Sequence, residues 1–441
     1  MVLSKILFRT SCIFKISNLK LPSRAMSSAT RFSKLLNPDD ASIRYKTVVE
    51  VKEGLRLRMG VEEGYQLLVK NRAHLLDKLP KSQAELPVRN LRDSFDSAII
   101  PLSTDIHFQN TYTNFLGNVR YGRLMEDLDM FAVHVVFKHM CCDFEKQEVV
   151  PFIVATILVD EIVMSDYIPK CNQDVRISGH VSWAGATSVE VIVWCEQFDN
   201  GTWREITRAI FLMASRNATM TAGAFVNAIQ PHDDEEKKIL LEGENRKKKR
   251  AKEGQNSLLK QLPTVEEQHL LHNLFLTTLD PGDITMDKRI LPPRKVWMSK
   301  TKKANVIFSH PEYRNLHNKV FGGFLMRVAA ELAFVTVYIH SKQVCPKMVC
   351  CGGISFHSPV DVGSLVSMTS QIVYTEKNYA QVTVYATVLD PFTTKQTTTN
   401  VFNFTYKSGD AMDEVVPESY CDAMRFLDGR RHFQDSLGLI H

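Results

Sequence analysis

Two long segments of the chain combine an apolar stretch with a carboxylate near its middle. In residues 114–137 the run MFAVHVVF follows Asp129, and in residues 318–340 the run LAFVTVYI follows Glu331. Each segment is long enough for about five helical turns and is apolar nearly all round. The pattern predicts two buried helices of about 17 residues, each beginning at a glycine.

Segments rich in Val, Ile, Thr and aromatic residues follow each predicted helix. SVEVIVW and QVTVYATV alternate with the period of two that strands require. The predicted strands are Ile153–Ile162, Gln173–Trp183, Ser188–Phe198 and Arg208–Ser215 after the first helix, and Met348–Phe356, Ser364–Tyr374, Tyr379–Leu389 and Thr397–Lys407 after the second. One helix followed by a meander of antiparallel strands predicts an α+β fold, with a curved sheet wrapped around a long buried helix.

The two sets of elements are copies of each other. At an offset of 201, three positions of the first helical segment fall on the same residue types in the second: Asn114 on Asn315, Val119 on Val320 and Gly122 on Gly323. At an offset of 191, HVSWAGATSVEVIV falls on QIVYTEKNYAQVTV, and RAIFLMASR falls on TNVFNFTYK. Three blocks in the same order at nearly the same offset indicate an internal duplication.

The charges are distributed unevenly along the 441 residues. Residues 1–38 contain seven Lys or Arg and no Asp or Glu, and the first acid is Asp39. These seven exceed the whole formal charge of +5, so the rest of the chain is slightly acidic and gives no reason to expect nucleic-acid binding. A basic, serine-rich, acid-free start predicts a mitochondrial presequence rather than a merely disordered tail. The longest apolar-rich run that we identify, Val149 to Val159, is too short for a transmembrane segment.

A charged segment, HDDEEKKILLEGENRKKKRAKEGQ, separates the two copies. Its basic run Arg246–Lys252 could be a nuclear signal or an anion-binding patch, but charge runs usually face solvent, which favours a solvated linker helix. The resulting division is 1–38 presequence, 39–94 lead-in, 95–231 first domain, 232–290 charged linker, 291–408 second domain and 409–441 C-terminal tail.

The glycines and the first acid could form a reactive site. A helix N-terminus carries free N–H groups and about half a positive charge, so Gly322 and Gly323 suit an oxyanion hole, although glycines also serve tight helix packing. Asp129 lies seven residues past Gly122, on the same helix face. Burial would raise its pKa and make it a general base, unless it only makes a structural hydrogen bond. Its neighbours Glu126 and Asp127 are interpreted as solvent-facing or capping charges.

The motifs HNKVFGGFLMRVAAELA and RYGRLMEDLD resemble those of the hotdog-fold acyl-coenzyme A thioesterases, and the resemblance extends from about residue 90 onward. It implies two tandem hotdog domains that hydrolyse acyl-CoA thioesters to free fatty acid and coenzyme A, without cofactor or metal. It also implies a mitochondrial enzyme, with the matrix as the expected compartment, that assembles as a homo-oligomer. A trimer of double hotdogs is expected from their exposed sheet edges.

The resemblance assigns roles to individual residues. Asp129 occupies the catalytic acid position of the first copy, and Asn315 the catalytic amide position of the second, so the site would form between the two copies. The mirror site would comprise Asn114 and Gly122 with Glu331. That acid comes one residue late, after Ala330, so it is rotated by about 100° around the helix. Thr187 and Ser188 stand where the family often contacts coenzyme A, although a plain β-turn also explains them.

Other reaction classes find little support in the sequence. There is no G-x-S-x-G motif for a serine esterase, no Walker or G-x-G-x-x-G loop, and no C-x-x-C pair for zinc. His134, on the first apolar helix, is interpreted as a core histidine. Two alternatives to hydrolysis remain: a hotdog enoyl-CoA hydratase, which uses an Asp/His pair, and a non-catalytic acyl-CoA-binding sensor.

The acid-free start yields a first prediction. We expect residues up to about the Arg24–Ser33 region to be removed on import into mitochondria. N-terminal sequencing of the protein isolated from mitochondria measures this. Recovery of an intact Met1 from the matrix, or of a purely cytosolic protein, would contradict it.

Overall fold

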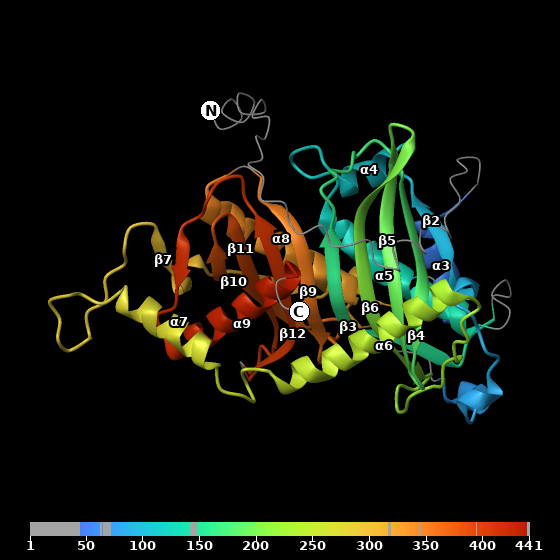
Figure 1. Ribbon diagram of the computed structural model, residues 1–441. Helices are drawn as coiled ribbons and strands as arrows, with labels where there is room; N and C mark the ends of the chain where they lie inside the picture. Colours follow the sequence, from blue (N-terminus) through green and yellow to red (C-terminus); the bar gives the residue numbers. More distant parts are fainter. Residues whose placement is uncertain are drawn as a thin grey trace.

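The computed structural model describes residues 45–61, 64, 72–141, 148–315, 319–343, 345–393 and 395–438. Within these residues, 11 strands form one sheet in the order β1-β2-β4-β5-β6-β3-β9-β12-β11-β10-β8, and β13 pairs with β7 in a separate two-stranded sheet. Helices lie in front of and behind this sheet (Figure 1). The predicted α+β class with an antiparallel sheet is therefore confirmed. The predicted presequence lies outside the described residues.

The eight strands predicted from alternation all exist. They are β3 (Phe152–Met164), β4 (Val175–Ala184), β5 (Ser188–Asp199), β6 (Thr202–Asn217), β9 (Lys347–Phe356), β10 (Leu365–Glu376), β11 (Tyr379–Leu389) and β12 (Gln396–Lys407). Strands that the alternation did not reveal are short: β1 (Lys46–Thr47), β2 (Asp96–Ile100), β7 (Lys295–Trp297), β8 (Lys303–Phe308) and β13 (Glu414–Val416). Segments of two to six residues contain too few alternations for a period to be recognised.

The two apolar segments form the helices α5 (Tyr121–Met140) and α8 (Gly322–Ser341), each 20 residues long. The other α-helices are α3 (Val48–Arg58), α4 (Ile106–Tyr112), α6 (Asp234–Gln255), α7 (Val265–Leu276) and α9 (Tyr420–Ser436). Short 3-10 helices occupy Ala73–Lys78, Gln83–Glu85, Arg92–Ser94, Met298–Thr301 and Pro311–Tyr313.

The sheet consists of two halves with mirrored strand order. The first half runs β2-β4-β5-β6-β3 and the second runs β9-β12-β11-β10-β8, and they join where β3 pairs antiparallel with β9, opposing Val159 to Ile354. Helix α5 packs on β3 to β6, and α8 packs on β8 and β10 to β12. Because α5 and α8 also pack against each other, one hydrophobic core spans both halves.

Helix α8 is the most apolar helix in the described residues. By length and composition alone it could cross a membrane, yet 56% of the relevant stretch is buried inside the protein. It contacts α5 and the strands β10, β11 and β12, as a core helix does. Our expectation that Val149–Val159 would be the longest apolar run was therefore wrong, because the embedded Glu331 obscured the longer run in α8.

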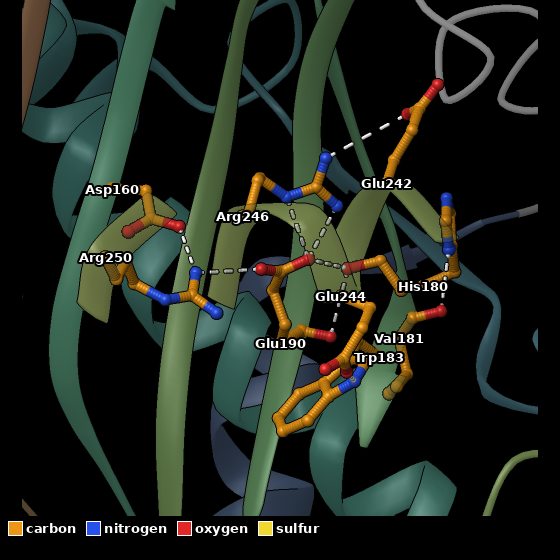
Figure 2. A network of polar contacts seen from close by, with 10 residues as sticks. Asp160, His180, Val181, Trp183, Glu190, Glu242, Glu244, Arg246 and Arg250 are labelled. Atoms are coloured by element: carbon orange, nitrogen blue, oxygen red, sulfur yellow. Dashed lines mark hydrogen bonds and ion pairs between the residues drawn. The ribbon is translucent and has the colours of Figure 1, made fainter. Parts of the chain in front are cut away.

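Helix α6 is not the fully solvated linker that its charges predict. It begins at the capping residue Asp233 and buries Ile239 completely. Figure 2 shows the contact that fixes it to the sheet: the buried carboxylate of Glu190 on β5 accepts hydrogen bonds from Arg246 and Arg250 of α6. The Oε1···Nη2 distance to Arg246 is 2.6 Å, and Arg250 also pairs with Asp160 of β3. Two arginines of the basic run thus serve a buried ion-pair network rather than solvent.

Helices α5 and α8 meet close to their N-terminal ends. A Cβ atom at Gly323 would lie 2.9 Å from the Cα of Glu126, nearer than van der Waals contact allows. A Cβ atom at Gly122 would lie 3.0 Å from the Cγ of Arg327. The two backbones can therefore approach as they do because both positions are glycine.

This contact predicts that Gly323→Ala destabilises the fold. The added methyl group meets backbone that cannot move independently, so we expect a loss of about 1–3 kcal/mol in the free energy of unfolding. Gly254→Ala in α6 is the matched control, since a Cβ atom there meets nothing within 4 Å. Alanine is also the better helix former, so the control should be neutral or slightly stabilising. Denaturant unfolding of both variants measures the difference, and equal stabilities would refute the close contact.

Candidate active site

The carboxylate of Asp129 lies inside the contact between the two halves of the molecule. Its side chain is buried, and its two oxygens have donors from different elements. Thr156 of β3 donates its hydroxyl to Oδ1 at 2.6 Å, and Gly323 at the start of α8 donates its N–H to Oδ2 at 2.8 Å. The acid is therefore held between a strand of the first half and a helix of the second.

Burial raises the pKa of Asp129 to about 6. The hydrogen bonds from Thr156 and Gly323 act in the opposite direction, because they stabilise the ionised carboxylate, while the nearby charge of Glu126 raises the pKa further. An acid with a pKa about 6 is ionised at neutral pH and still basic enough to accept a proton from water. The position thus has the electrostatics of a general base.

The glycine pair that begins α8 lies directly against this acid. A Cβ atom at Gly322 would come within 3.3 Å of Oδ2 of Asp129 and 3.0 Å of the Phe356 ring. The first N–H groups of a helix have no intrahelical acceptor, so the start of α8 presents donors here. The sequence indicates both glycine amides as candidate oxyanion donors, but the amide of Gly323 bonds to the acid itself.

Two other acids on α5 differ from expectation. We expected Glu126 and Asp127 to face solvent or cap the helix, and this is wrong. Glu126 pairs with Arg123 at 2.9 Å and with Arg327 of α8 at 3.0 Å. Asp127 accepts the hydroxyl of Tyr112 at 2.6 Å, and burial raises its pKa to about 7. Arg123 lies on α5 itself, whereas Tyr112 and Arg327 come from α4 and α8.

Asn315 lies in the loop that leads into α8. Its side-chain oxygen accepts the N–H of Lys319 at 3.1 Å, and its own N–H donates to the carbonyl of Lys319 at 2.6 Å. The first bond orients the side-chain amide, and the second fixes the backbone of the loop, seven residues before Gly322 in the sequence. Among the described residues, no cluster of three or more His, Cys, Asp and Glu side chains could hold a metal ion.

The mirror position differs in its acid. Ala330 stands at the place that Asp129 holds in the first copy, and it is almost fully buried. Glu331, one residue later, has a side chain that is 42% exposed and pairs with Arg120 of the first half. Asn114 accepts the N–H groups of Leu116 and Asn118. The mirror site therefore retains its amide and Gly122 but has no buried carboxylate.

A large cavity opens at this mirror position. Its volume is about 1610 Å³, and both halves of the molecule line it. Asn114, Gly122, Ala330 and Glu331 are among its lining residues, whereas Asp129 is not. The two positions of the duplication have thus become different: one holds a buried acid, and the other holds a cavity with a paired, displaced acid.

Sequence comparison identifies the family. No family model matches the chain. It is 39% identical over 389 residues to mouse "Acyl-coenzyme A thioesterase 9, mitochondrial", covering 87% of this chain and 88% of that protein. The chain belongs to the acyl-coenzyme A thioesterase family. Mouse "Acyl-coenzyme A thioesterase 10, mitochondrial" is also 39% identical, over 357 residues and 81% of each chain. This confirms the resemblance seen in the glycine and helix motifs.

More distant relatives of the thioesterase include a hop protein, "Acyl-coenzyme A thioesterase 2, chloroplastic" from Humulus lupulus, 29% identical over 78% of this chain and 82% of that protein. Among solved structures, an acyl-CoA hydrolase from Staphylococcus aureus covers 33% of this chain and 92% of its own, with a TM-score of 0.31 and 18% identity. A structural likeness this low carries no argument about function.

The remaining predicted residues of the thioesterase lie where the β4–β5 turn enters β5. Thr187 stands in the turn, where its carbonyl accepts the N–H of Ser215, and Ser188 is the first residue of β5. In the sheet, Ser188 of β5 lies opposite Ala214 of β6, and Ala214 lies opposite Ala155 of β3. The Cα of Ser188 is therefore about two strand spacings, roughly 10 Å, from the Cα of Ala155, the residue before Thr156. Neither Thr187 nor Ser188 lines the cavity. Their contact with coenzyme A stays a prediction.

Sequence reasoning missed Thr156, although it is the nearest hydroxyl donor to the acid. It lies 27 residues after Asp129, in an alternating strand where threonine is common. No local motif marks it, because its role depends on β3 lying against α5. The available signal was a polar side chain on the inward face of a predicted strand.

The hydrogen bond from Thr156 predicts a shifted pH profile. Thr156→Val removes a bond worth about 1.5–3 kcal/mol to a charged group, so the pKa of Asp129 should rise by about one unit or more. The acid limb of kcat/KM, expected about pH 6 in the wild type, should move upward by the same amount. Thr156→Ser keeps the hydroxyl and should leave the limb in place. If both variants change only stability or KM and the acid limb stays in place, Thr156 has a packing role and does not set the pKa of Asp129.

Proposed function

We propose that the protein hydrolyses acyl-CoA thioesters to free fatty acid and coenzyme A at one composite site per chain. The site comprises Asp129 of the first half with Asn315, Gly322 and Gly323 of the second. One observation carries the proposal: the carboxylate of Asp129 on α5 accepts a hydrogen bond from the N–H of Gly323 at the N-terminus of α8. Neither half holds both groups, so the duplication is required for the site.

We interpret each half as one hotdog domain, residues 95–231 and 291–408. Each half has five strands with the same connectivity, and one long buried helix packs against the sheet. In this interpretation the helices α5 and α8 form the interface between two tandem hotdogs. The antiparallel pairing of β3 with β9 then makes one continuous sheet from two domains.

In the proposed reaction, Asp129 accepts a proton from the attacking water. Its raised pKa suits this role, and Thr156 holds the carboxylate in place. The thioester carbonyl oxygen would lie at the start of α8. There the amide of Gly322 and the side chain of Asn315 stabilise the negative charge that develops in the transition state. The amide of Gly323 orients the base instead, which modifies the role expected from the sequence.

The thiolate of coenzyme A then leaves, and the attacking oxygen stays with the acyl group. The proton accepted by Asp129 passes to the leaving sulfur or to solvent. No metal or cofactor takes part in this scheme. A C–O bond forms between water and the carbonyl carbon as the C–S bond breaks, and the electron pair of the C–S bond leaves with the sulfur. Hydrolysis therefore balances with water as the only co-reactant.

The two alternative functions receive less support. A hydratase needs an Asp/His pair, but the described donors to Asp129 are a hydroxyl and an amide. The His134 ring on α5 lies 2.8 Å from Asp96 of β2 and is buried in the first half, as expected for a core histidine. A non-catalytic sensor is favoured only by the mirror position, where Ala330 replaces the acid.

The proposed location is the mitochondrion, since the names of the relatives that are 39% identical include it. The basic, acid-free residues 1–38 support import into the matrix. We further propose a homo-oligomer, with a trimer of chains as the first candidate. Strand β8 is the last strand of the described sheet, and a free edge of this length favours association.

The asymmetry of the two positions predicts one productive site. Asp129→Asn should lower kcat by two or more orders of magnitude, the scale of general acid–base catalysis, while KM changes little because the volume is kept. Glu331→Gln and Asn114→Ala should cost much less, and release of the coenzyme A thiol measures all three. An inactive Glu331→Gln with an active Asp129→Asn would reverse the assignment.

Thermal melting provides the folding control for these variants. The folded-state pKa of Asp129 is raised, so its contribution to stability is largest at low pH and is lost as pH rises through about 6. At pH 7.5 the Asp129→Asn variant, whose amide is neutral, should therefore melt at the same temperature as the wild type or higher. A lower melting temperature would indicate that lost activity reflects lost structure.

A further inference from the structure

The cavity at the mirror position has the construction of a ligand site. At about 1610 Å³ it exceeds the roughly 300–1,000 Å³ of common small-molecule pockets. Gly122, at the start of the 20-residue helix α5, lines one end of it, and N–H groups at a helix start attract acceptor atoms. Glu331, which also lines the cavity, pairs with Arg120, so its charge is compensated.

Aromatic side chains form much of the cavity wall. Phe115 of the first half makes edge contacts with Phe334 and Tyr338 of α8 at centroid distances of 6.3 and 6.4 Å. Phe115 is 64% exposed although it is a large apolar residue. Rings of this kind stack against a planar base or an apolar chain. They would gain burial if a ligand filled the cavity.

Two lysines at the cavity suit phosphate groups. Lys407 lies over the Tyr379 ring at 5.4 Å, and Lys377 lies in the neighbouring turn. In the described part of the chain, neither has a carboxylate within ion-pair distance. The lining acids have other partners: Glu331 pairs with Arg120, Asp166 with Lys347, Glu376 with the Tyr374 hydroxyl and Asp410 with the Gln343 amide.

We propose that this cavity binds a coenzyme A compound without hydrolysing it, and that its occupancy alters the Asp129 site. The inference rests on the proposed function, because it takes Asp129 to be the general base. The chemistry recognised is a phosphorylated nucleotide with a long pantetheine arm. Both the free coenzyme A product and an intact acyl-CoA present it, and they differ by the acyl chain that the aromatic wall would bury.

The two sites are connected by a short series of contacts. Glu331 at the cavity lies 3.9 Å from Arg327, which pairs with Glu126 at 3.0 Å. The backbone of Glu126 lies directly against Gly323, whose N–H holds Asp129. A ligand that displaces the Glu331–Arg120 pair therefore acts on a tightly packed helix crossing. Such packing transmits a shift of one helix to the other.

Binding stoichiometry tests the proposed site directly. Isothermal titration of the full-length protein with coenzyme A, and separately with a thioether analogue of an acyl-CoA that cannot be hydrolysed, should give two molecules per chain. A second site that accepts only the analogue identifies acyl-CoA as its ligand, and one that accepts both identifies the nucleotide arm as sufficient. One molecule per chain for both compounds overturns the proposal.

Two substitutions on α8 separate the cavity from the rest of the helix. Val335→Trp fills the cavity from an exposed lining position, whereas Ile339→Trp adds the same side chain at an exposed position one turn later that does not line it. We expect Val335→Trp to reduce the stoichiometry from two to one, and Ile339→Trp to retain two. Equal stoichiometry in the two variants overturns the assignment to this cavity.

Steady-state kinetics tests the coupling. Coupling between two sites typically changes affinity by about 5- to 150-fold. A coenzyme A concentration that saturates the cavity should therefore change KM at least about 5-fold more in the wild type and Ile339→Trp than in Val335→Trp, where coenzyme A competes at the Asp129 site alone. Identical KM changes in all three proteins overturn the coupling. If Asp129→Asn stays active while two molecules still bind, the proposed function fails and the second site stands.

Discussion

The carboxylate of Asp129 is buried where α5 crosses α8, and a buried charge is stable only with donors around it. Its donors come from Thr156, 27 residues later, and from the amide of Gly323, 194 residues later. The first half alone would leave this acid without one of its two partners, because Gly323 belongs to the second half. The continuous sheet through β3 and β9 and the shared core keep the partners in place.

The geometry of that acid depends on how closely the two helices approach. Glycine at position 122 leaves room for Arg327 of α8, and glycine at position 323 leaves room for the backbone of Glu126 on α5. A larger residue at either position would push the two helices apart. The same residues that suit a substrate-facing helix start are therefore also packing residues. The two interpretations of the glycine motif are not alternatives here, because close approach of the backbone serves both the helix crossing and the exposure of N–H groups.

The outer face of the sheet repeats this use of glycine. A Cβ atom at Gly243 of α6 would lie 2.7 Å from Trp183, and one at Gly429 of α9 would overlap the side chain of Val373. Each half thus has a helix that packs closely on the face opposite its core helix. In the first half, the ion pairs of Glu190 with Arg246 and Arg250 add to this contact, as Figure 2 shows. Lys249 of α6 pairs with Asp435 of α9 at 2.6 Å, so the two outer helices also join the halves.

The sequence by itself determined the elements and the duplication. Alternating β-branched residues place β3 to β6 and β9 to β12, and two apolar segments place α5 and α8, because these patterns reflect burial on one face or all round. The one-residue displacement of Glu331 was also readable from the alignment of the two copies. Only the tertiary structure decided what each polar residue contacts. Thr156, the amide of Gly323 and the arginines of α6 lie far from their partners in sequence, and no local pattern records a contact that forms when distant elements pack.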